Sequence, residues 1–75
     1  MRTVSITLPQ AARVFTEDEH RLSDTNMSLP VGAKVAVGMQ CEMLYGDRAQ
    51  TALPFEFEDG TYYLLVEEVK IGFSL

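Results

Sequence analysis

The sequence lacks the residues from which most cysteine- and histidine-based sites are built. It has a single cysteine, Cys41, and a single histidine, His20, in 75 residues. One cysteine forms no internal disulfide, and a structural zinc site needs about four such ligands, so the sequence encodes neither. It also lacks a G-x-S-x-G nucleophile turn and a glycine-rich phosphate loop. We therefore predict a non-enzymatic protein that needs no cofactor.

Positive charge is also scarce. Lys and Arg together number 6 against 11 Asp and Glu, which gives a net charge of −5. Negative charge repels phosphate backbones, so we expect no direct binding to nucleic acid. The sequence has no run of ~20 apolar residues that could cross a bilayer. Its start, MRTVSITLP, lacks the basic and long apolar segments of a secretory signal, so a soluble cytoplasmic protein without membrane contacts is predicted.

Size and hydrophobic content predict one folded domain spanning residues 1–75. Hydrophobic residues make up 47% of the chain, which is well above the range of disordered proteins. A domain of this size buries only about 60% of its unfolded surface and cannot support two cores. Its stability is expected to be modest, so dimerisation or binding to a larger partner would help it.

The first half of the chain is predicted to contain a strand, a helix and a loop. Residues 3–8 alternate polar and apolar side chains, which predicts a half-buried strand. Pro9 suits a first helical turn, and apolar spacing of three and four predicts a helix within residues 9–22. Alternatively, a capping box at residues 16–19 would start a shorter helix at Glu17 and leave residues 11–15 extended. Residues 23–30 are rich in turn formers and predict a loop.

The stretch VAVGMQCEMLY, residues 35–45, is predicted to form one long strand. Its period of two places apolar and sulfur-containing side chains on an inner face, namely Val35, Val37, Met39, Cys41 and Met43. Residues 45–50 are predicted to be a connection, and residues 51–57 a further strand. Pro54 cannot donate to a strand ladder, which predicts that it lies at an edge or a bulge and that this strand is exposed on one side.

Asp59 and Gly60 between aromatic segments predict a β-hairpin, because a two-residue type I′ turn needs positive φ at both positions. In that register Phe57 faces Tyr62 on a core surface, and the opposite surface is acidic and wet. Further along the chain, the apolar residues change from even to odd positions, so a regular strand would place them on opposite faces. The first set is Tyr62, Leu64 and Val66, and the second is Val69, Ile71 and Phe73. A β-bulge near Glu67 and Glu68 is predicted to reset the alternation; alternatively, this strand is buried on both faces.

Together these elements predict an α+β fold, with an antiparallel sheet of three to four strands and one short helix near the N-terminus. The sheet is expected to be a β-meander. Residues 29–37 resemble the G-x-x-V-x-V entry strand of small SH3-like barrels, which is one form that such a sheet can take. The pattern is too short to identify a family.

Two sulfur-based sites can be weighed from the sequence. Met39, Cys41 and Met43 could bind a soft metal such as Cu(I), which thioether and thiolate ligands suit. Core packing is the favoured interpretation, since Met fills irregular cores and free Cys is commonly buried. Cys41 and His20 could form a nucleophile and its base only if the fold brings them together.

The most distinctive electrostatic feature is the segment from residue 55 to residue 68, which has five carboxylates and no Lys or Arg. Alternation along a strand would project Glu56 and Glu58 together. We predict a partner-binding surface that consists of Glu42, Glu56, Glu58, Asp59, Tyr63, Glu67 and Glu68. The expected partner is a larger protein with a basic surface, and electrostatic attraction would steer the association.

In a sharper form of this hypothesis the protein is a nucleic-acid mimic. It would block a nucleic-acid-binding machine, as small phage-type inhibitors do, and would then be a viral protein. One alternative is a structural small subunit or homodimer that assembles through an exposed β-edge, with an acidic face that is only solvated and keeps the protein soluble. A further alternative is the soft-metal binder.

Overall fold

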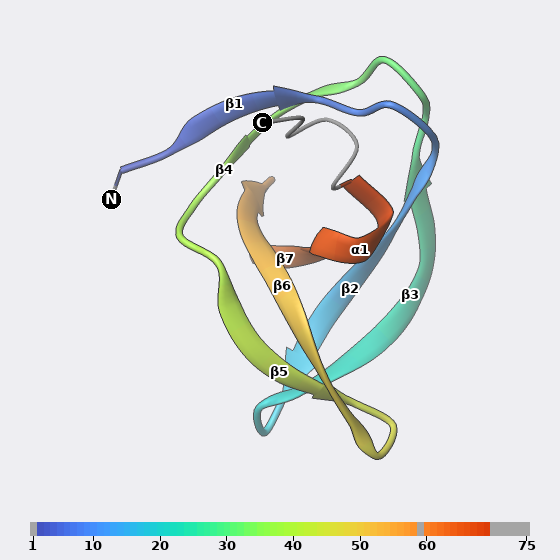
Figure 1. The fold of residues 1–75 in the computed structure, drawn as a ribbon, viewed down its shortest axis with the longest axis vertical. Coiled ribbons are helices and arrows are strands. Elements are labelled where there is room, and N and C mark those ends of the chain that lie inside the picture. Colours follow the sequence, from blue (N-terminus) through green and yellow to red (C-terminus); the bar gives the residue numbers. More distant parts are fainter. Residues whose placement is uncertain (1, 59, 70–75) are drawn as a thin grey trace.

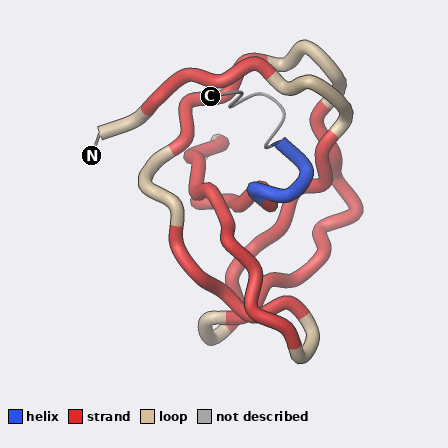
Figure 2. The backbone as a smooth tube through the Cα atoms, viewed as in Figure 1, coloured by secondary structure: helices blue, strands red, loops and turns tan. Residues whose placement is uncertain are grey.

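The protein is almost entirely β-sheet. The computed structural model describes residues 2–58 and 60–69 and shows one 7-stranded sheet with a short helix (Figure 1). The elements are β1 (Val4–Thr7), β2 (Ala12–Asp18), β3 (Arg21–Leu29), β4 (Lys34–Val37), β5 (Cys41–Tyr45), β6 (Arg48–Phe57), β7 (Gly60–Leu65) and α1 (Val66–Val69). In Figure 2 strands make up most of the path, and the helix is a single blue turn.

The sheet closes on itself. Its strand order is β1-β4-β6-β5-β3-β2-β7, and an additional pairing joins β6 to β7. These pairings link β6, β5, β3, β2 and β7 into a ring, while β4 and then β1 extend from β6. The pairings are antiparallel except for β3–β5, which is parallel and rests on Arg21 opposite Leu44. The curvature of the ring is visible in Figure 1.

The predicted α+β fold with an N-terminal helix and three to four antiparallel strands is wrong, because the sheet is mixed, 7-stranded and dominates the structure. Most of residues 9–22 form β2 and the start of β3. Glu19 and His20 have φ angles of 52° and 68°, which suit the two-residue type I′ turn of a hairpin. The helix prediction failed because Val14 and Phe15 are neighbours buried in different clusters, so the apolar spacing imitated a helical stripe.

The predicted loop at residues 23–30 is also wrong, since most of it belongs to β3. Val14 pairs with Met27 and Phe15 pairs with Asp24, so β3 carries a bulge at Thr25 and Asn26. The Thr25 hydroxyl donates a hydrogen bond to the Val14 carbonyl at 2.7 Å, and Asn26 has a φ of 66°. The turn-forming residues therefore shape a bulge inside a strand instead of ending it.

The stretch VAVGMQCEMLY forms two strands. β4 ends at Val37 and β5 begins at Cys41, with residues 38–40 between them. The predicted continuous inner face is wrong, because Met39 lies in this break and is 84% exposed. The break faces β6, which pairs with β5 through Ala52 and with β4 through Phe55.

Pro54 lies where β6 changes from one partner strand to the other. Proline has no N–H to donate, and its carbonyl accepts a hydrogen bond from the Gly38 N–H at 2.8 Å. On the other side of β6, Pro54 pairs with Tyr63 of β7. The predicted exposed edge at Pro54 is therefore wrong, because β6 has partner strands on both sides. Pro54 occupies an irregularity inside the sheet, which agrees better with the alternative of a bulge.

The predicted hairpin is confirmed as the antiparallel pair β6–β7, but its register differs by two residues. Phe57 pairs with Gly60, not with Tyr62. Glu58 begins the turn with a φ of 55°, and Asp59 lies outside the described residues. A shift of two residues keeps each side chain on its predicted face, and Leu53, Phe55 and Leu64 on the same face as Phe57 are buried. Phe57 itself is 43% exposed, so the prediction that the core surface reaches Phe57 is wrong.

α1 directly follows β7. The predicted β-bulge at Glu67 and Glu68 is wrong, because both residues lie in this helical turn, which buries Val69. Because the helical turn ends the strand at Leu65, the apolar residues after it need not continue the alternation of β7. Ile71 and Phe73, which also motivated the bulge, lie outside the described residues. Within residues 2–58 and 60–69, no helix has the length and apolar character needed to span a membrane.

The strands β2, β6 and β7 contribute to two hydrophobic clusters. The first cluster contains Ile6, Leu8, Ala12, Val14, Val37, Leu53, Phe55, Leu64 and Val69. The second cluster contains Phe15, Leu22, Met43, Ala52 and Leu65. Adjacent residues such as Leu64 and Leu65 are thus both buried, one in each cluster. The hairpin face opposite Leu53, Phe55 and Leu64 was predicted to be exposed to solvent. This prediction is wrong near Leu65, which is buried, and the face is exposed only toward the turn.

Candidate acidic binding surface

The predicted partner-binding residues do not form one surface, and only some of them meet at the β6–β7 hairpin. Glu56 lies on β6 and Tyr63 on β7, while Glu58 lies at the start of the turn between these strands. The side chains of Glu56 and Glu58 are exposed. Asp59 falls outside the described residues. The remaining three predicted residues lie on β5 and α1, away from this turn.

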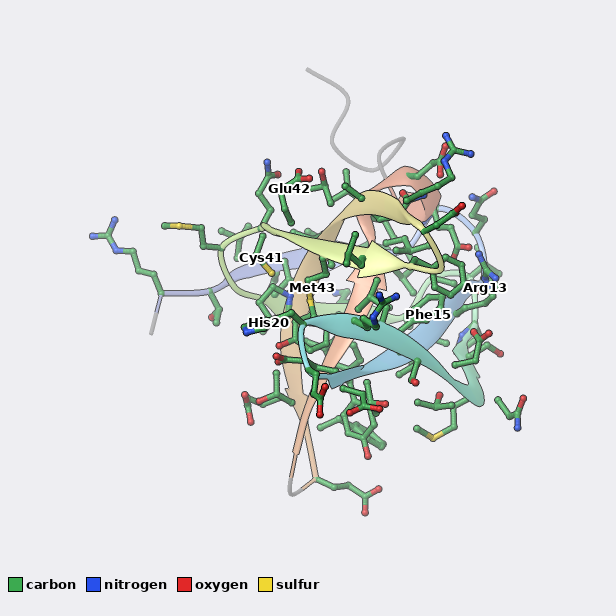
Figure 3. The ribbon with its side chains drawn as sticks, turned by 90° about the horizontal axis from the view of Figure 1, so that it is seen from below. Arg13, Phe15, His20, Cys41, Glu42 and Met43 are labelled. Atoms are coloured by element: carbon green, nitrogen blue, oxygen red, sulfur yellow. The ribbon has the colours of Figure 1, made fainter. Side chains whose placement is uncertain are left out.

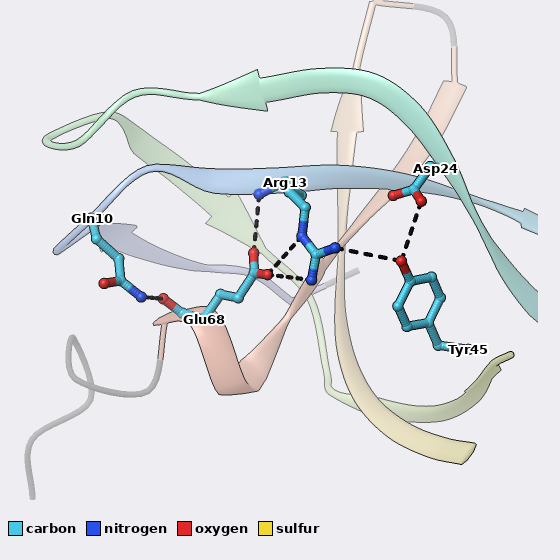
Figure 4. Close-up of polar contacts among 5 residues, drawn as sticks. All are labelled: Gln10, Arg13, Asp24, Tyr45 and Glu68. Atoms are coloured by element: carbon cyan, nitrogen blue, oxygen red, sulfur yellow. Dashed lines mark hydrogen bonds and ion pairs between the residues drawn. The ribbon is translucent and has the colours of Figure 1, made fainter. Parts of the chain in front are cut away.

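Glu68 of α1 is held in an ion pair within the fold. Its carboxylate accepts hydrogen bonds from Arg13 N at 3.0 Å and from Arg13 Nε at 2.8 Å, and its Oε2 lies 2.7 Å from Arg13 Nη2 (Figure 4). The hydrogen bond to Glu68 raises the pKa of the Arg13 guanidinium, which therefore stays charged. Arg13 also lies over the rings of Phe15 and Tyr45. Because Arg13 neutralises Glu68, we exclude Glu68 from the candidate surface.

Glu42 and Glu67 contribute to a different patch. Glu42 Oε2 accepts a hydrogen bond from the Thr51 hydroxyl at 2.8 Å, and Thr51 and Glu67 line one shallow hollow. Thr51 and Glu56 differ in strand parity, so their side chains leave β6 on opposite faces. Glu42 and Glu67 are therefore separated from the carboxylates of the hairpin.

A group of carboxylates and hydroxyls forms where β2, β7 and β6 lie side by side. The Tyr63 hydroxyl donates a hydrogen bond to Glu17 Oε1 at 3.0 Å and so connects β7 to β2. The Thr61 hydroxyl donates to Glu56 Oε2 at 2.6 Å and connects β7 to β6. We call Glu17, Glu56, Thr61 and Tyr63 the acidic platform, and Glu58 follows it in sequence at the start of the turn.

Strand alternation explains why these side chains meet. Phe15 pairs with Tyr63 across β2 and β7, and Glu56 pairs with Thr61 across β6 and β7. Glu17 lies two residues beyond Phe15, and Thr61 lies two residues before Tyr63, so all of them share one face. Phe15 belongs to the second cluster. The acidic platform is thus the solvent-exposed continuation of a buried core face.

The negative charge of the acidic platform has little compensation. In the described part of the chain, no Lys or Arg forms an ion pair with Glu17 or Glu56, and His20 Nδ1 lies 3.7 Å from Glu17 Oε2. Burial raises the pKa of Tyr63 to about 12, with added contributions from the hydrogen bond to Glu17 and from the charges of Glu17 and Glu56. Tyr63 is therefore neutral at pH 7 and donates its proton to the hydrogen bond without changing the charge of the surface.

Glu17 is the platform residue that the sequence did not reveal. Its neighbours suggested a helical capping box, and the adjacent core residues Val14 and Phe15 hide the period of two. The one local signal for a strand is the run of β-branched and aromatic residues from Val14 to Thr16. Pairing of Glu17 with Tyr63 depends on the tertiary fold and has no local signature.

The proposed sulfur site does not form. Met39 is 84% exposed, whereas Met43 is 7% exposed and belongs to the second cluster. In Figure 3, Cys41 and Met43 lie along one strand, with Glu42 turned outward between them. The three sulfurs therefore do not share a face. Core packing accounts for the buried Met43 and for Cys41, which is partly buried against the same cluster.

Cys41 is also poorly suited to be a nucleophile. Burial raises the pKa of its thiol, and the charges of Glu17 and Glu42 raise it as well. The thiol therefore stays protonated near neutral pH, while the reactive species is the thiolate. The His20 side chain is 95% exposed and contacts Glu17. Within residues 2–58 and 60–69, no group of three or more His, Cys, Asp or Glu residues could hold a metal ion.

The other face of the hairpin end is apolar. A groove there is lined by Val14, Met27, Ser28, Leu29, Phe55 and Phe57. Met27 is 40% exposed and Phe57 is 43% exposed, and the Phe57 ring lies 6.0 Å from the Tyr62 ring in an edge-to-face arrangement. The hairpin thus presents carboxylates on one face and aromatic surface on the other.

Comparison with known proteins assigns no family to this fold. No family model, no curated protein and no solved structure shows significant similarity to the chain.

Proposed function

We propose that the protein is a non-enzymatic binding module whose acidic platform docks on a basic surface of a larger protein. The observation that carries this proposal is the pair of hydrogen bonds by which β7 orients the carboxylates of Glu17 and Glu56. Side chains that are already held in place lose less conformational entropy when they bind. A partner Arg or Lys would therefore meet negative charge that is preorganised.

The type of hydrogen-bond donor matters as much as the orientation. A neutral hydroxyl positions a carboxylate and leaves its charge available, as Tyr63 does for Glu17. A guanidinium positions a carboxylate and cancels its charge, as Arg13 does for Glu68. Only the first arrangement leaves a carboxylate ready to attract a cationic partner.

The spacing of the carboxylates favours an extended basic surface over a single cation. Glu17 and Glu56 lie on the strands that flank β7. Neighbouring strands lie about 4.7–4.9 Å apart, so the backbones that carry the two carboxylates are separated by about 10 Å. Grooves that bind nucleic acid carry rows of cations along the backbone that they hold. This spacing supports the sharper proposal that the protein occupies a nucleic-acid-binding groove.

Affinity capture from lysate of the native host tests the proposal. The bait is the wild type, the platform variant Glu17→Lys/Glu56→Lys, or the control variant Glu42→Lys/Glu67→Lys. Both variants change the net charge of −5 by the same amount, and all four glutamates are exposed. We expect the wild type and the control to retain the same partner and the platform variant to lose it.

Equal capture by all three baits would overturn the proposal. Equal loss with both variants would also contradict it, because it would show that net charge alone controls binding. If a partner is retained, displacement by added nucleic acid tests the sharper form. A partner that holds nucleic acid and the protein at the same time contradicts groove blocking while leaving the docking proposal intact.

A further inference from the structure

β1 has one partner strand among the described residues and leaves its other edge open. It lies at the end of the strand order, and within residues 2–58 and 60–69 its one partner is β4. In Figure 1, β1 forms the outer border of the structure and leads to the N-terminus. An open edge exposes backbone N–H and C=O groups that can pair with another strand.

The hydrogen bonds identify which backbone groups of β1 face outward. The Leu8 N–H donates to the Ala33 carbonyl at 2.9 Å, and the Leu8 carbonyl accepts from the Gly32 N–H at 2.8 Å. In an antiparallel pair the residues alternate between facing the partner and facing away. Ile6 therefore also faces β4, while the N–H and C=O groups of Ser5 and Thr7 face the open edge.

β1 lacks the features that usually protect an open edge. β3 pairs with β5 only at Arg21 among the described residues, and the rest of that edge of β3 is protected against pairing with another strand. It has a bulge with a positive φ at Asn26 and an exposed charge at Asp24. β1 has a regular register against β4 and contains no proline and no charged residue. Its Val4 side chain is 65% exposed. β1 is therefore open to strand addition, whereas β3 is not.

We propose that β1 pairs antiparallel with β1 of a second copy of the chain, about a two-fold axis at Ser5. In this register Ser5 faces Ser5 of the second copy, and Thr3 faces Thr7. The outward-facing positions thus meet each other, as a hydrogen-bonded antiparallel ladder requires. Val4 of each copy lies opposite Ile6 of the other, on the face where Ile6 reaches the first cluster.

A second copy fits this edge because the strand is complementary to itself. The register opposes hydroxyl-bearing residues to one another and aliphatic residues to one another, with no charge opposite an apolar side chain from residue 3 to residue 7. It also covers Val4, the most exposed aliphatic side chain of the strand. Residues 2–9 contain no carboxylate, so this edge escapes the repulsion expected between two copies with a net charge of −5.

The dimer would change how the protein binds. Glu17 and Glu56 lie on β2 and β6, and β1 pairs with neither strand, so its pairing leaves the acidic platform uncovered. Each dimer would present two platforms. A partner with two basic sites would then be bound bivalently, which strengthens binding without any new contact.

Sedimentation velocity over a concentration series tests the dimer. The samples are the wild type, Val4→Lys and the control Val31→Lys, which changes a valine that is also 65% exposed and lies outside the strands. We expect the wild type and Val31→Lys to dimerise alike, and Val4→Lys to lower the association constant at least about tenfold. A wild type that stays monomeric overturns the proposal, as does equal dimerisation of Val4→Lys or equal loss with both variants.

Amide hydrogen exchange tests the register independently. Exchange at Ser5 and Thr7 should slow as the wild-type concentration rises, because their N–H groups enter the dimer ladder. Exchange at Ile6 and Leu8 should not depend on concentration, because these N–H groups already face β4. Val4→Lys should remove the concentration dependence at Ser5 and Thr7 and retain protection at Ile6 and Leu8, which shows that it folds. Protection without this alternation overturns the register.

Discussion

The Tyr63 hydroxyl donates a hydrogen bond to the Glu17 carboxylate at 3.0 Å, between residues that are 46 positions apart in sequence. The bond joins β2 to β7, next to the register pair of Phe15 and Tyr63. One contact therefore has two roles. It helps to hold the ring of strands closed, and it orients a charge on the surface.

Replacing Tyr63 by Phe should lower the free energy of unfolding by about 1 kcal/mol, because it removes one hydrogen bond to a carboxylate. Tyr62→Phe is the matched control, since the neighbouring Tyr62 hydroxyl forms no side-chain hydrogen bond with the described residues. Urea denaturation at pH 7 measures both changes. Equal stability of the two variants would contradict the assigned role of the Tyr63 hydroxyl.

The raised pKa of Tyr63 also predicts a dependence on alkaline pH. The pKa rises from 10.0 to about 12 in the folded protein, so the neutral phenol is favoured by folding. Its contribution to stability is complete below about pH 10 and is lost as the pH rises toward 12. The stability difference between the wild type and Tyr63→Phe should therefore shrink over this range. A difference that grows with pH would contradict the assignment.

Glu68→Ala should lower the free energy of unfolding by about 1 kcal/mol, because it removes a multidentate pair that is only partly exposed. The neighbouring Glu67→Ala should change stability by less than about 0.5 kcal/mol, since Glu67 is exposed and forms no ion pair in the described residues. Denaturation at low and high salt should show a smaller effect of Glu68→Ala at high salt. Equal effects of the two substitutions would show that the ion pair does not stabilise the fold.

The turn at Glu19 and His20 can be improved. Both residues have positive φ, which costs residues with a Cβ but suits Asn-Gly in a type I′ turn. Glu19→Asn/His20→Gly should therefore raise the free energy of unfolding by about 1 kcal/mol. The same substitution inside a helix would be destabilising because both new residues are weak helix formers. Loss of stability would thus contradict the β2–β3 hairpin.

The two methionines near Cys41 should respond differently to truncation. Met43→Ala should cost about 2–5 kcal/mol, because Met43 is buried in the second cluster. Met39→Ala should change stability by less than about 0.5 kcal/mol, because Met39 is 84% exposed. Thermal denaturation measures both. Similar losses of stability for the two variants would mean that both methionines are buried, as in the single long strand that the sequence alone predicted.

The sequence predicted the C-terminal half of the fold better than the N-terminal half. The alternation of apolar and polar residues and the Asp59-Gly60 turn signal located the β6–β7 hairpin. The register differs from the predicted one by two residues, and because alternation has a period of two, each side chain stays on its predicted face. In β2 the same reasoning from alternation failed to predict a strand, because the adjacent residues Val14 and Phe15 are both buried. Residues that serve different clusters give a strand no regular period, and only tertiary contacts reveal them.

The sequence predicted part of the grouping of the acidic side chains, while their role in binding a partner stays a prediction. Glu56 and Tyr63 do lie together, because they belong to paired strands that the hairpin signal connected. Glu68 was wrongly assigned to this surface because its partner, Arg13, is 55 positions away in sequence. Glu17 was missed for the same reason. Charge composition indicates which residues are available for a surface, but strand pairing decides which of them meet.

The dissociation constant of the captured partner across a salt series tests the acidic platform most directly. For the wild type, the logarithm of the affinity should fall steadily with the logarithm of the salt concentration. Glu17→Lys/Glu56→Lys should bind at least about a hundredfold more weakly at low salt, with a shallower dependence, so that the two curves converge at high salt. Equal affinity and equal slope for both proteins would contradict docking through the acidic platform.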